Sequence, residues 1–161
     1  MWNAIENELS AGWSLPWGIA AFRLLGSVLL CGLIGFEREI QRRPAGLRTH
    51  MLIGLAATVY TLMMLFLIDA PEAFDDHISM DPVRVIESIT SGVAFLAAGI
   101  VIFTQGQVKG LTTGASMWLA AAIGTAVGLG QWPLAVSTTG IALTIIYALR
   151  QFEAAVLDDP D

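Results

Sequence analysis

Five long apolar stretches, separated by short polar or glycine- and proline-containing segments, are the feature that most constrains how this chain can fold. A helix needs about 20 mostly apolar residues to cross the ~30 Å hydrocarbon core of a bilayer, and each stretch approaches that length. Charged residues make up only 14% of the 161 residues and apolar residues 55%, whereas about a quarter of a water-soluble domain is charged. We therefore expect an all-α membrane protein whose five transmembrane helices cover residues 17–36, 51–68, 84–103, 111–129 and 134–149 of a transmembrane domain over residues 17–150.

The two ends of the chain lie outside the predicted spans. Residues 1–16 contain no Lys or Arg and include Glu6 and Glu8, whereas a cleavable signal peptide begins with a basic region. Apolar residues spaced by three and four favour a short helix in the membrane interface, and a flexible lead-in is the alternative. We expect residues 151–161 to form a short cytoplasmic tail, without a C-terminal soluble domain.

The positive charges predict how the chain is oriented, because cytoplasmic loops retain Lys and Arg. If the N-terminus lies outside, six of the eight basic residues fall on the cytoplasmic side, and only Arg23 and Arg84 lie towards the outside. The opposite orientation would place those six residues outside. We therefore expect a multi-pass protein with its N-terminus outside and its C-terminus in the cytoplasm.

An internal repeat connects the first two spans with the next two. A shift of 64 residues lays residues 23–61 on residues 87–125 without gaps, and 10 of the 39 paired positions are identical. Gly-Leu-x-Thr opens both the second and the fourth span. This predicts a parallel repeat of two helix hairpins, related by an axis normal to the membrane, with a fifth helix added. The biased composition of apolar helices is the alternative explanation.

Two charged residues lie well inside the predicted spans, apart from Arg84 at the very start of the third. Arg23 is about six residues below the outer edge of the first span, or ~9 Å at 1.5 Å per residue. A charged side chain at such depth usually pairs with another charge or faces a cavity. The repeat places Glu87 at the equivalent position of the third span, which predicts an intramembrane charge pair between Arg23 and Glu87. The alternative is that Arg23 extends to the outer headgroups.

The segment between the first two spans is the most distinctive part of the chain. Its arginines suit the anionic inner leaflet, and Pro44-Ala45-Gly46 breaks the helix before the second span. Topology does not explain two carboxylates beside these arginines, so we expect salt bridges or a functional site facing the cytoplasm. The predicted cytoplasmic motif consists of Glu37, Arg38, Glu39, Arg42, Arg48, Thr49 and His50, and the corresponding motif of the second repeat consists of Lys109, Gly110, Leu111, Thr112 and Thr113.

Other residue types limit the chemistry to be expected. The acidic loop over residues 69–81 could attract divalent cations, although scattered carboxylates more often form a solvated loop, and His50 and His77 are too isolated for a metal site. No nucleophile–base arrangement, phosphate-binding loop or nucleotide motif appears, so we expect no enzyme, no cofactor and no nucleic-acid partner. Gly124 and Gly128 have the spacing at which membrane helices pack closely, which predicts that the fourth span lies at the bundle centre.

Four segments, in this order, are similar to one known family. They are residues 33–39 (Leu-Ile-Gly-Phe-Glu-Arg-Glu), residues 42–51 (Arg-Arg-Pro-Ala-Gly-Leu-Arg-Thr-His-Met), residues 81–99 with Asp-Pro-x-Arg at their start, and residues 108–121 (Val-Lys-Gly-Leu-Thr-Thr-Gly-Ala-Ser-Met-Trp-Leu-Ala-Ala). They resemble the MgtC/SapB family of membrane proteins over roughly residues 20–150. The chain departs from the family pattern at Ala94 and Ala97, where the family tends to have glycine, and at Lys109, where it tends to have arginine.

The resemblance implies a protein of the bacterial inner membrane that is tied to magnesium limitation, acid stress and survival inside host cells. Better-known members act as regulators that contact other membrane complexes, including the proton-translocating ATP synthase. We therefore expect a non-enzymatic regulator whose partners are the lipid bilayer and other inner-membrane proteins, and we also expect a homo-oligomer. A transporter or channel for magnesium or another cation is the alternative. Ion pathways need polar groups at mid-membrane depth, and Glu87 is the one carboxylate within a predicted span.

Overall fold

The computed structural model describes residues 2, 15–69, 81–104 and 107–157. Five helices in this part of the chain are long and apolar enough to cross a membrane, as predicted. The helices are α2 (Trp17–Ile40), α3 (Leu47–Asp69), α4 (Pro82–Ile100), α5 (Leu111–Gly128) and α6 (Trp132–Leu157), and two short strands, β1 (Ile102–Thr104) and β2 (Gln107–Lys109), form an antiparallel hairpin between α4 and α5. The predicted interfacial helix and most of the acidic loop lie outside the described residues.

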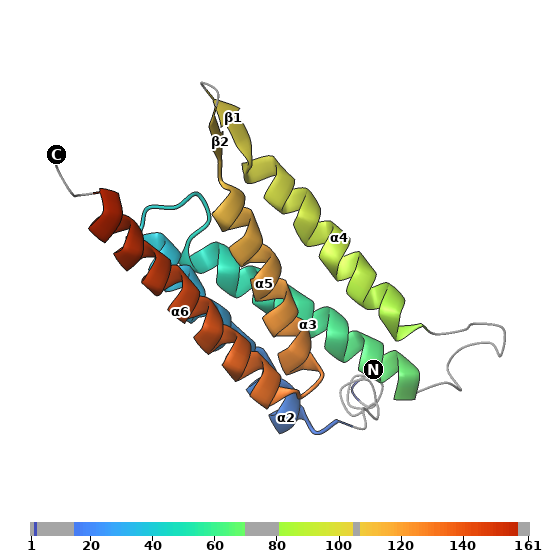
Figure 1. Ribbon diagram of the computed structural model, residues 1–161. Coiled ribbons are helices and arrows are strands. Elements are labelled where there is room, and N and C mark those ends of the chain that lie inside the picture. Colours follow the sequence, from blue (N-terminus) through green and yellow to red (C-terminus); the bar gives the residue numbers. More distant parts are fainter. Residues whose placement is uncertain (1, 3–14, 70–80, 105–106, 158–161) are drawn as a thin grey trace.

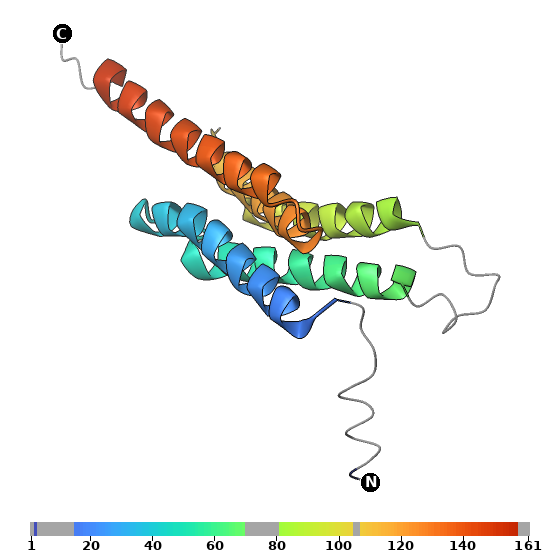
Figure 2. The ribbon, with the colours of Figure 1, turned by 90° about the horizontal axis from the view of Figure 1, so that it is seen from below.

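The helices form two layers, with α2 and α3 in one layer and α4, α5 and α6 in the other (Figures 1 and 2). α5 lies in the middle and contacts the four other helices. In its most apolar stretch 61% of the residues are buried, whereas the corresponding share in α4 is 6%. The fourth span is thus central, as its small side chains predict, and α4 stands at the edge of the bundle.

α3 and α5 approach each other at backbone distance because the residues that face each other are small. A Cβ atom added at Gly124 would collide with the carbonyl oxygen of Gly54 and lie 2.9 Å from its Cα. One turn further on, a Cβ atom at Gly128 would lie 2.6 Å from the Cβ of Thr61. The hydroxyl of Thr58 lies 2.9 Å from the carbonyl of Gly54 and 2.8 Å from that of Gly124, so it can donate to either. The space between these helices is therefore filled.

Several helix ends differ from the predicted spans. α2 continues to Ile40 and α3 begins at Leu47, so that helical structure includes much of the charged segment. α6 continues to Leu157, past the predicted end at residue 149. The reason is that hydropathy marks the part of a helix that lipid surrounds, whereas the backbone hydrogen bonds continue beyond it. α4 instead ends early, at Ile100, and β1 of the hairpin begins at Ile102, still inside the span predicted over residues 84–103.

α4 begins at Pro82, two residues before the predicted span. Pro82 occupies its first turn, where the missing backbone N–H has no intrahelical role. The side chain of Asp81 accepts a hydrogen bond from the backbone N–H of Val83 over 3.0 Å, which satisfies one of the free donors of the helix start. The beginning of α4 is therefore fixed by local sequence.

An open, apolar groove of about 840 Å³ separates α3 from α4. The α4 helix packs mainly against α5, and Val93 is its one buried residue. The groove therefore leaves part of α3 and much of α4 facing outward. Its lining includes Leu52, Ala56 and Tyr60 from α3 and Val85, Ile89 and Leu96 from α4.

Candidate functional site at the basic end of the bundle

The basic end of the bundle is the end at which α2 stops and at which α3 and α5 begin (Figure 1). It contains both motifs that the sequence singles out. Four cations lie exposed there: Arg42, Arg43, Arg48 and Lys109. The packing of the other motif residues determines what this surface can do.

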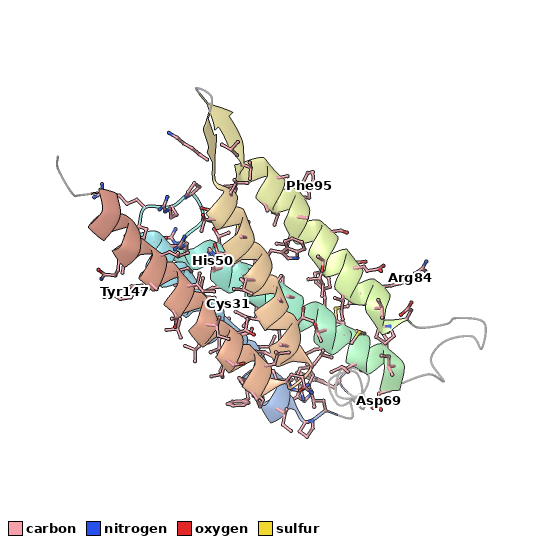
Figure 3. The ribbon with its side chains drawn as sticks, in the orientation of Figure 1. Cys31, His50, Asp69, Arg84, Phe95 and Tyr147 are labelled. Atoms are coloured by element: carbon pink, nitrogen blue, oxygen red, sulfur yellow. The ribbon has the colours of Figure 1, made fainter. Side chains whose placement is uncertain are left out.

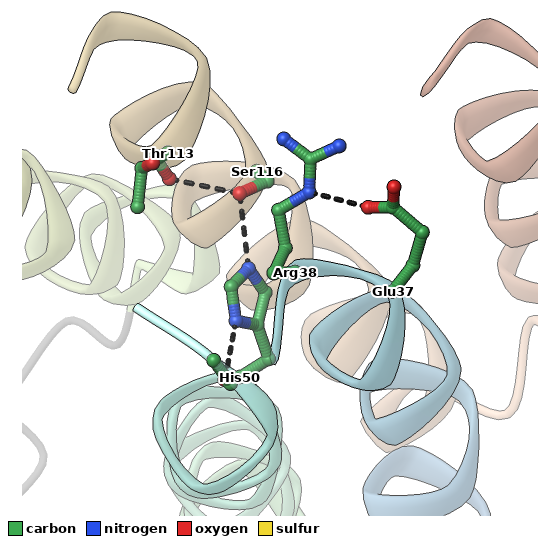
Figure 4. A network of polar contacts seen from close by, with 6 residues as sticks. Glu37, Arg38, His50, Thr113 and Ser116 are labelled. Atoms are coloured by element: carbon green, nitrogen blue, oxygen red, sulfur yellow. Dashed lines mark hydrogen bonds and ion pairs between the residues drawn. The ribbon is translucent and has the colours of Figure 1, made fainter. Parts of the chain in front are cut away.

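Glu37 and Arg38, which are neighbours near the end of α2, form an ion pair. Arg38 donates from Nε to Oε2 of Glu37 over 2.7 Å, and the two side chains are 5% and 20% exposed. A buried guanidinium without a carboxylate partner is costly, so Glu37 stabilises Arg38 in its buried position. The terminal nitrogens of Arg38 point away from Glu37 and His50 (Figure 4) and make no hydrogen bond within the described residues.

Glu39 holds the turn between α2 and α3. Its Oε2 accepts a hydrogen bond from the backbone N–H of Leu47 over 3.0 Å, at the first residue of α3. The same carboxylate occupies the place where a side chain at Gly46 would lie. A carboxylate is favoured at a helix start, where free N–H groups and the helix dipole attract negative charge. Glu39 thus explains why α3 begins before the apolar stretch does.

Arg42 ends α2 in a left-handed backbone conformation, with φ 51°. The backbone N–H of Arg43 donates to the carbonyl of Arg38 over 3.0 Å, and that of Arg42 donates to the carbonyl of Glu39 over 2.9 Å. These two bonds are those of the Schellman motif, in which glycine usually takes the left-handed position. A residue with a side chain adopts this conformation at a cost, so the position of Arg42 is imposed by the surrounding turn.

His50 connects α3 to α5 inside the basic end (Figure 4). Its Nδ1 lies 2.8 Å from the carbonyl oxygen of Gly46, and its Nε2 lies 3.0 Å from Oγ of Ser116. A carbonyl can only accept, so Nδ1 carries a proton, and Nε2 of the neutral ring accepts from Ser116. Oγ of Ser116 also lies 2.9 Å from the carbonyl of Thr113. The hydroxyl proton therefore serves one of two acceptors at a time.

The contact between His50 and Ser116 has the distance of a base beside a nucleophile, but it lacks the surroundings of a catalytic pair. His50 is 0% exposed and Ser116 5% exposed, so a substrate cannot reach either side chain. A backbone carbonyl, and not a carboxylate, orients the ring. The arrangement therefore joins two helices and satisfies buried polar groups. No group of three or more His, Cys, Asp or Glu side chains that could hold a metal ion occurs in the described ranges.

The remaining motif residues are divided between surface and interior. Thr49 is half-buried and lines the groove between α3 and α4. In the second motif, Leu111 and Thr112 are exposed, whereas Thr113 is buried and belongs to the His50 network. Gly110 precedes α5 as Gly46 precedes α3, and these helices begin 64 residues apart, in agreement with the repeat.

Arg23 and Glu87 do not form the ion pair that the sequence predicts. Arg23 donates from Nη1 to the carbonyl oxygen of Gly128 over 2.8 Å, at the end of α5. Its Nε is buried without a hydrogen-bond partner in the described part of the chain. Glu87 is exposed on α4, on the edge of the bundle. The free carbonyls and the dipole at a helix end attract a cation, which explains why Arg23 binds there. Equivalent positions in a repeat need not meet in space.

The residues that complete these contacts carry no clear signal in the sequence. Gly46, Gly54, Thr58 and Ser116 have no charge, and each lies in or beside an apolar run. A hydroxyl inside an apolar span is a weak signal, because it can bond its own helix, as Thr144 does with Gly140 on the exposed side of α6. Only the packing of α3 against α5 distinguishes Ser116 from such residues.

Comparison with known proteins decides the family. The MgtC family matches residues 24–155, a range that contains α3, α4 and α5 and the whole basic end. The chain belongs to the MgtC family. This confirms the resemblance seen in the sequence. No solved structure matches the chain.

Named relatives within the MgtC family come from several bacteria. "Putative magnesium transporter YhiD" from Escherichia coli (strain K12) is 33% identical over 129 residues, which are 80% of this chain and 60% of YhiD. "Protein MgtC" from Salmonella typhimurium (strain LT2) is 38% identical over 128 residues, 80% of this chain and 51% of that protein. "Protein MgtC" from Brucella abortus (strain 2308) is 38% identical over 138 residues, 84% and 51% of the two chains. The chain thus spans half to three fifths of the length of these relatives.

Proposed function

We propose that this MgtC-family protein is a non-enzymatic regulator in the bacterial inner membrane, which acts by contacting other membrane proteins under magnesium limitation or a related stress. In this proposal the basic end faces the cytoplasm. It offers the exposed cations of the two predicted motifs, Arg42, Arg48 and Lys109, to acidic groups of a partner protein. The ion pair between Glu37 and Arg38 and the hydrogen bond that the Leu47 N–H donates to Glu39 hold this surface in one conformation.

The packing of α3 against α5 is the observation that carries the proposal. A pathway for ions needs polar groups around a cavity at mid-membrane depth. Gly54 and Gly124 instead meet at backbone distance, and the hydroxyl of Thr58 is hydrogen-bonded beside them. Arg23 binds a helix end and Glu87 lies on the edge of the bundle. A filled interior supports a protein that works through its surfaces.

Transport of magnesium or another cation is the second candidate, and the name of YhiD favours it. For transport, α3 and α5 would have to separate or several copies would have to form the pathway between them. The two candidates can be distinguished by measuring flux directly. We expect purified protein in liposomes to give no magnesium flux above that of empty vesicles, with an added ionophore as the positive control. A saturable magnesium flux that a bulky residue placed between α3 and α5 abolishes would contradict the regulator and support the transporter.

The role of the basic end can be tested in cells that depend on this protein for growth at limiting magnesium. Arg48 is exposed and makes no hydrogen bond or ion pair within the described residues. Arg48→Ala should therefore abolish growth while the amount of protein in the membrane stays unchanged. Arg43→Ala removes the same charge from the same end, outside the predicted motif, and is the matched control. Equal effects of both variants would mean that only net charge matters, and reduced abundance of Arg48→Ala would mean a structural role.

A further inference from the structure

One face of α4 is turned away from the rest of the protein and has an unusual composition. Its residues follow one another at intervals of three and four, which is the spacing of a helix–helix seam. All are exposed. We call this surface the outer α4 face, and it consists of Arg84, Glu87, Ser91, Ala94 and Ala98, with Phe95 beside it.

The outer α4 face lies opposite to the apolar side of the same helix. Val85, Ile89 and Leu96 line the groove towards α3, and Val93 is buried. The charged and small residues therefore face outward, where lipid would favour large apolar side chains. Figure 3 shows Arg84 and Phe95 pointing away from the other helices, and Phe95 is 80% exposed. Phe95 suits a lipid-facing surface, whereas the charged and small residues of the outer α4 face do not.

Arg84 and Glu87 have opposite charges on this face, and neither has an ion-pair partner among the described residues. Glu87 lies five residues into α4, which is about 7.5 Å along the helix axis. An unpaired carboxylate at this depth is costly in lipid, and such residues usually pair. Within the chain Arg23, the predicted partner of Glu87, is bound to Gly128. Arg84, three residues before Glu87 on the same helix, makes no ion pair with it either, so we consider a partner on another molecule.

A second copy of this chain would supply both missing charges. All copies cross the membrane in the same direction, so a two-fold axis relating two of them is normal to the membrane and their α4 helices run parallel. In a symmetric interface each contact occurs twice. Arg84 of one copy and Glu87 of the other would differ in height by about 4.5 Å, which an arginine side chain spans. The small side chains of Ser91, Ala94 and Ala98 would let the helices approach closely below this pair.

We propose that two copies of this protein associate through their outer α4 faces, with Arg84 of each copy paired to Glu87 of the other. An unrelated partner helix would need the opposite charges at matching heights, whereas a second copy carries them already. The apolar groove between α3 and α4 has no charged lining residue, so nothing indicates an occupant other than lipid chains. The inference goes beyond the proposed function, because dimers could form in either a regulator or a transporter.

Cysteine crosslinking in native membranes tests which face of α4 meets the second copy. The background is the full chain with Cys31→Ala, because Cys31 is the one cysteine. Ser91→Cys should give a disulfide-linked dimer on mild oxidation. Ser88→Cys is the matched control, since Ser88 is an exposed serine of the same helix but lines the groove. The proposal would be overturned if Ser88→Cys crosslinked and Ser91→Cys did not, or if neither variant crosslinked.

Charge exchange tests the pairing itself. Arg84→Glu leaves two carboxylates on the face and Glu87→Arg leaves two cations, so each variant should lower the crosslinked fraction of Ser91→Cys by roughly tenfold through like-charge repulsion. Coexpression of the two variants with different tags should restore crosslinking, now between unlike chains. Unchanged crosslinking in the single variants would contradict the pairing. So would a failure of coexpression to restore crosslinking when both variants keep the melting temperature of the parent. Arg48→Ala should leave the crosslinking of Ser91→Cys unchanged. A failure of the proposed function can therefore be distinguished from a failure of the dimer.

Discussion

Arg42 at the end of α2 and Gly130 at the end of α5 occupy the same position of the Schellman motif. Both have a left-handed backbone, with φ 51° and 77°. At the end of α5 the N–H of Gln131 donates to the carbonyl of Ala126, and the N–H of Gly130 donates to the carbonyl of Val127. The N–H groups of Arg43 and Arg42 make the corresponding two bonds at the end of α2. The motif favours glycine. An arginine at this position lowers stability, which suggests that its side chain is retained for function.

Arg42→Gly should therefore raise the stability of the protein by about 1 kcal/mol, because the left-handed conformation costs roughly that much when a Cβ is present. Thermal unfolding of the purified protein in detergent measures the effect as a higher Tm. We expect the same variant to support growth at limiting magnesium less well than the parent. Arg43→Gly, at the neighbouring exposed arginine, is the control and should not raise Tm. A variant with unchanged or lower Tm would show that the turn does not strain Arg42.

The bond between His50 and Ser116 should couple α3 to α5. Ser116→Ala leaves Nε2 of His50 buried without its partner, at a cost of about 1–3 kcal/mol, whereas His50→Ala leaves Ser116 its bond to the carbonyl of Thr113 and should cost less for this contact. The double variant should lose less than the sum of the two, because the second substitution removes a group that the first left unpaired. Thr144→Ala is the control, because it also deletes a hydroxyl that donates to a carbonyl, but at an exposed position. The Tm of this variant should be close to that of the parent. Additive losses at His50 and Ser116 would mean that these groups do not interact.

Close contact at Gly124 predicts a strong effect of a single methyl group. Gly124→Ala drives a Cβ into the backbone of Gly54, so α3 and α5 must separate. Overpacking of this kind costs about 1–3 kcal/mol. Gly140→Ala on α6 is the control, because a Cβ added there meets nothing within 4 Å. We expect Gly124→Ala to lower Tm and membrane abundance and Gly140→Ala to leave both near the parental values. A tolerated Gly124→Ala would contradict the filled interior on which the proposed function rests.

Arg23 and Glu87 should behave independently. Arg23→Ala removes a charged hydrogen bond to the end of α5, and such bonds contribute about 1.5–3 kcal/mol. Glu87→Ala acts on the opposite edge of the bundle, so the loss in Tm of the double variant should equal the sum of the two single losses. A coupling above about 0.5 kcal/mol would mean that the two side chains interact, as the internal repeat first predicts.

The orientation of the chain can be checked with an impermeant thiol reagent. In the Cys31→Ala background, Asp69→Cys at the end of α3 and Arg43→Cys at the basic end are both exposed positions at opposite ends of the bundle. Asp69→Cys should react in intact cells, and Arg43→Cys should react only after lysis. The reverse pattern would place the basic end outside and would remove its proposed cytoplasmic partner.

The sequence alone determined which parts of the chain are helical. Five apolar stretches leave few alternatives, because backbone groups in lipid must be hydrogen-bonded within a helix or a closed barrel. Local chemistry also fixed particular ends. Pro82 in the first turn of α4 and the small side chains that make α5 central could both be predicted, since each effect acts within one helix or through side-chain size.

The tertiary structure decided which polar groups meet. Arg23 could be assigned a depth from the sequence, but its acceptor, the carbonyl of Gly128, is a backbone atom that no residue type reveals. His50 appeared to belong to an exposed motif, yet it is buried against Ser116 because α5 inserts between the other helices. Glu87 and Arg23 occupy equivalent positions in the repeat, but α4 lies at the edge while α2 is packed against its neighbours. Contacts between helices depend on rotation and distance, which apolar sequences specify only through the fit of many side chains at once.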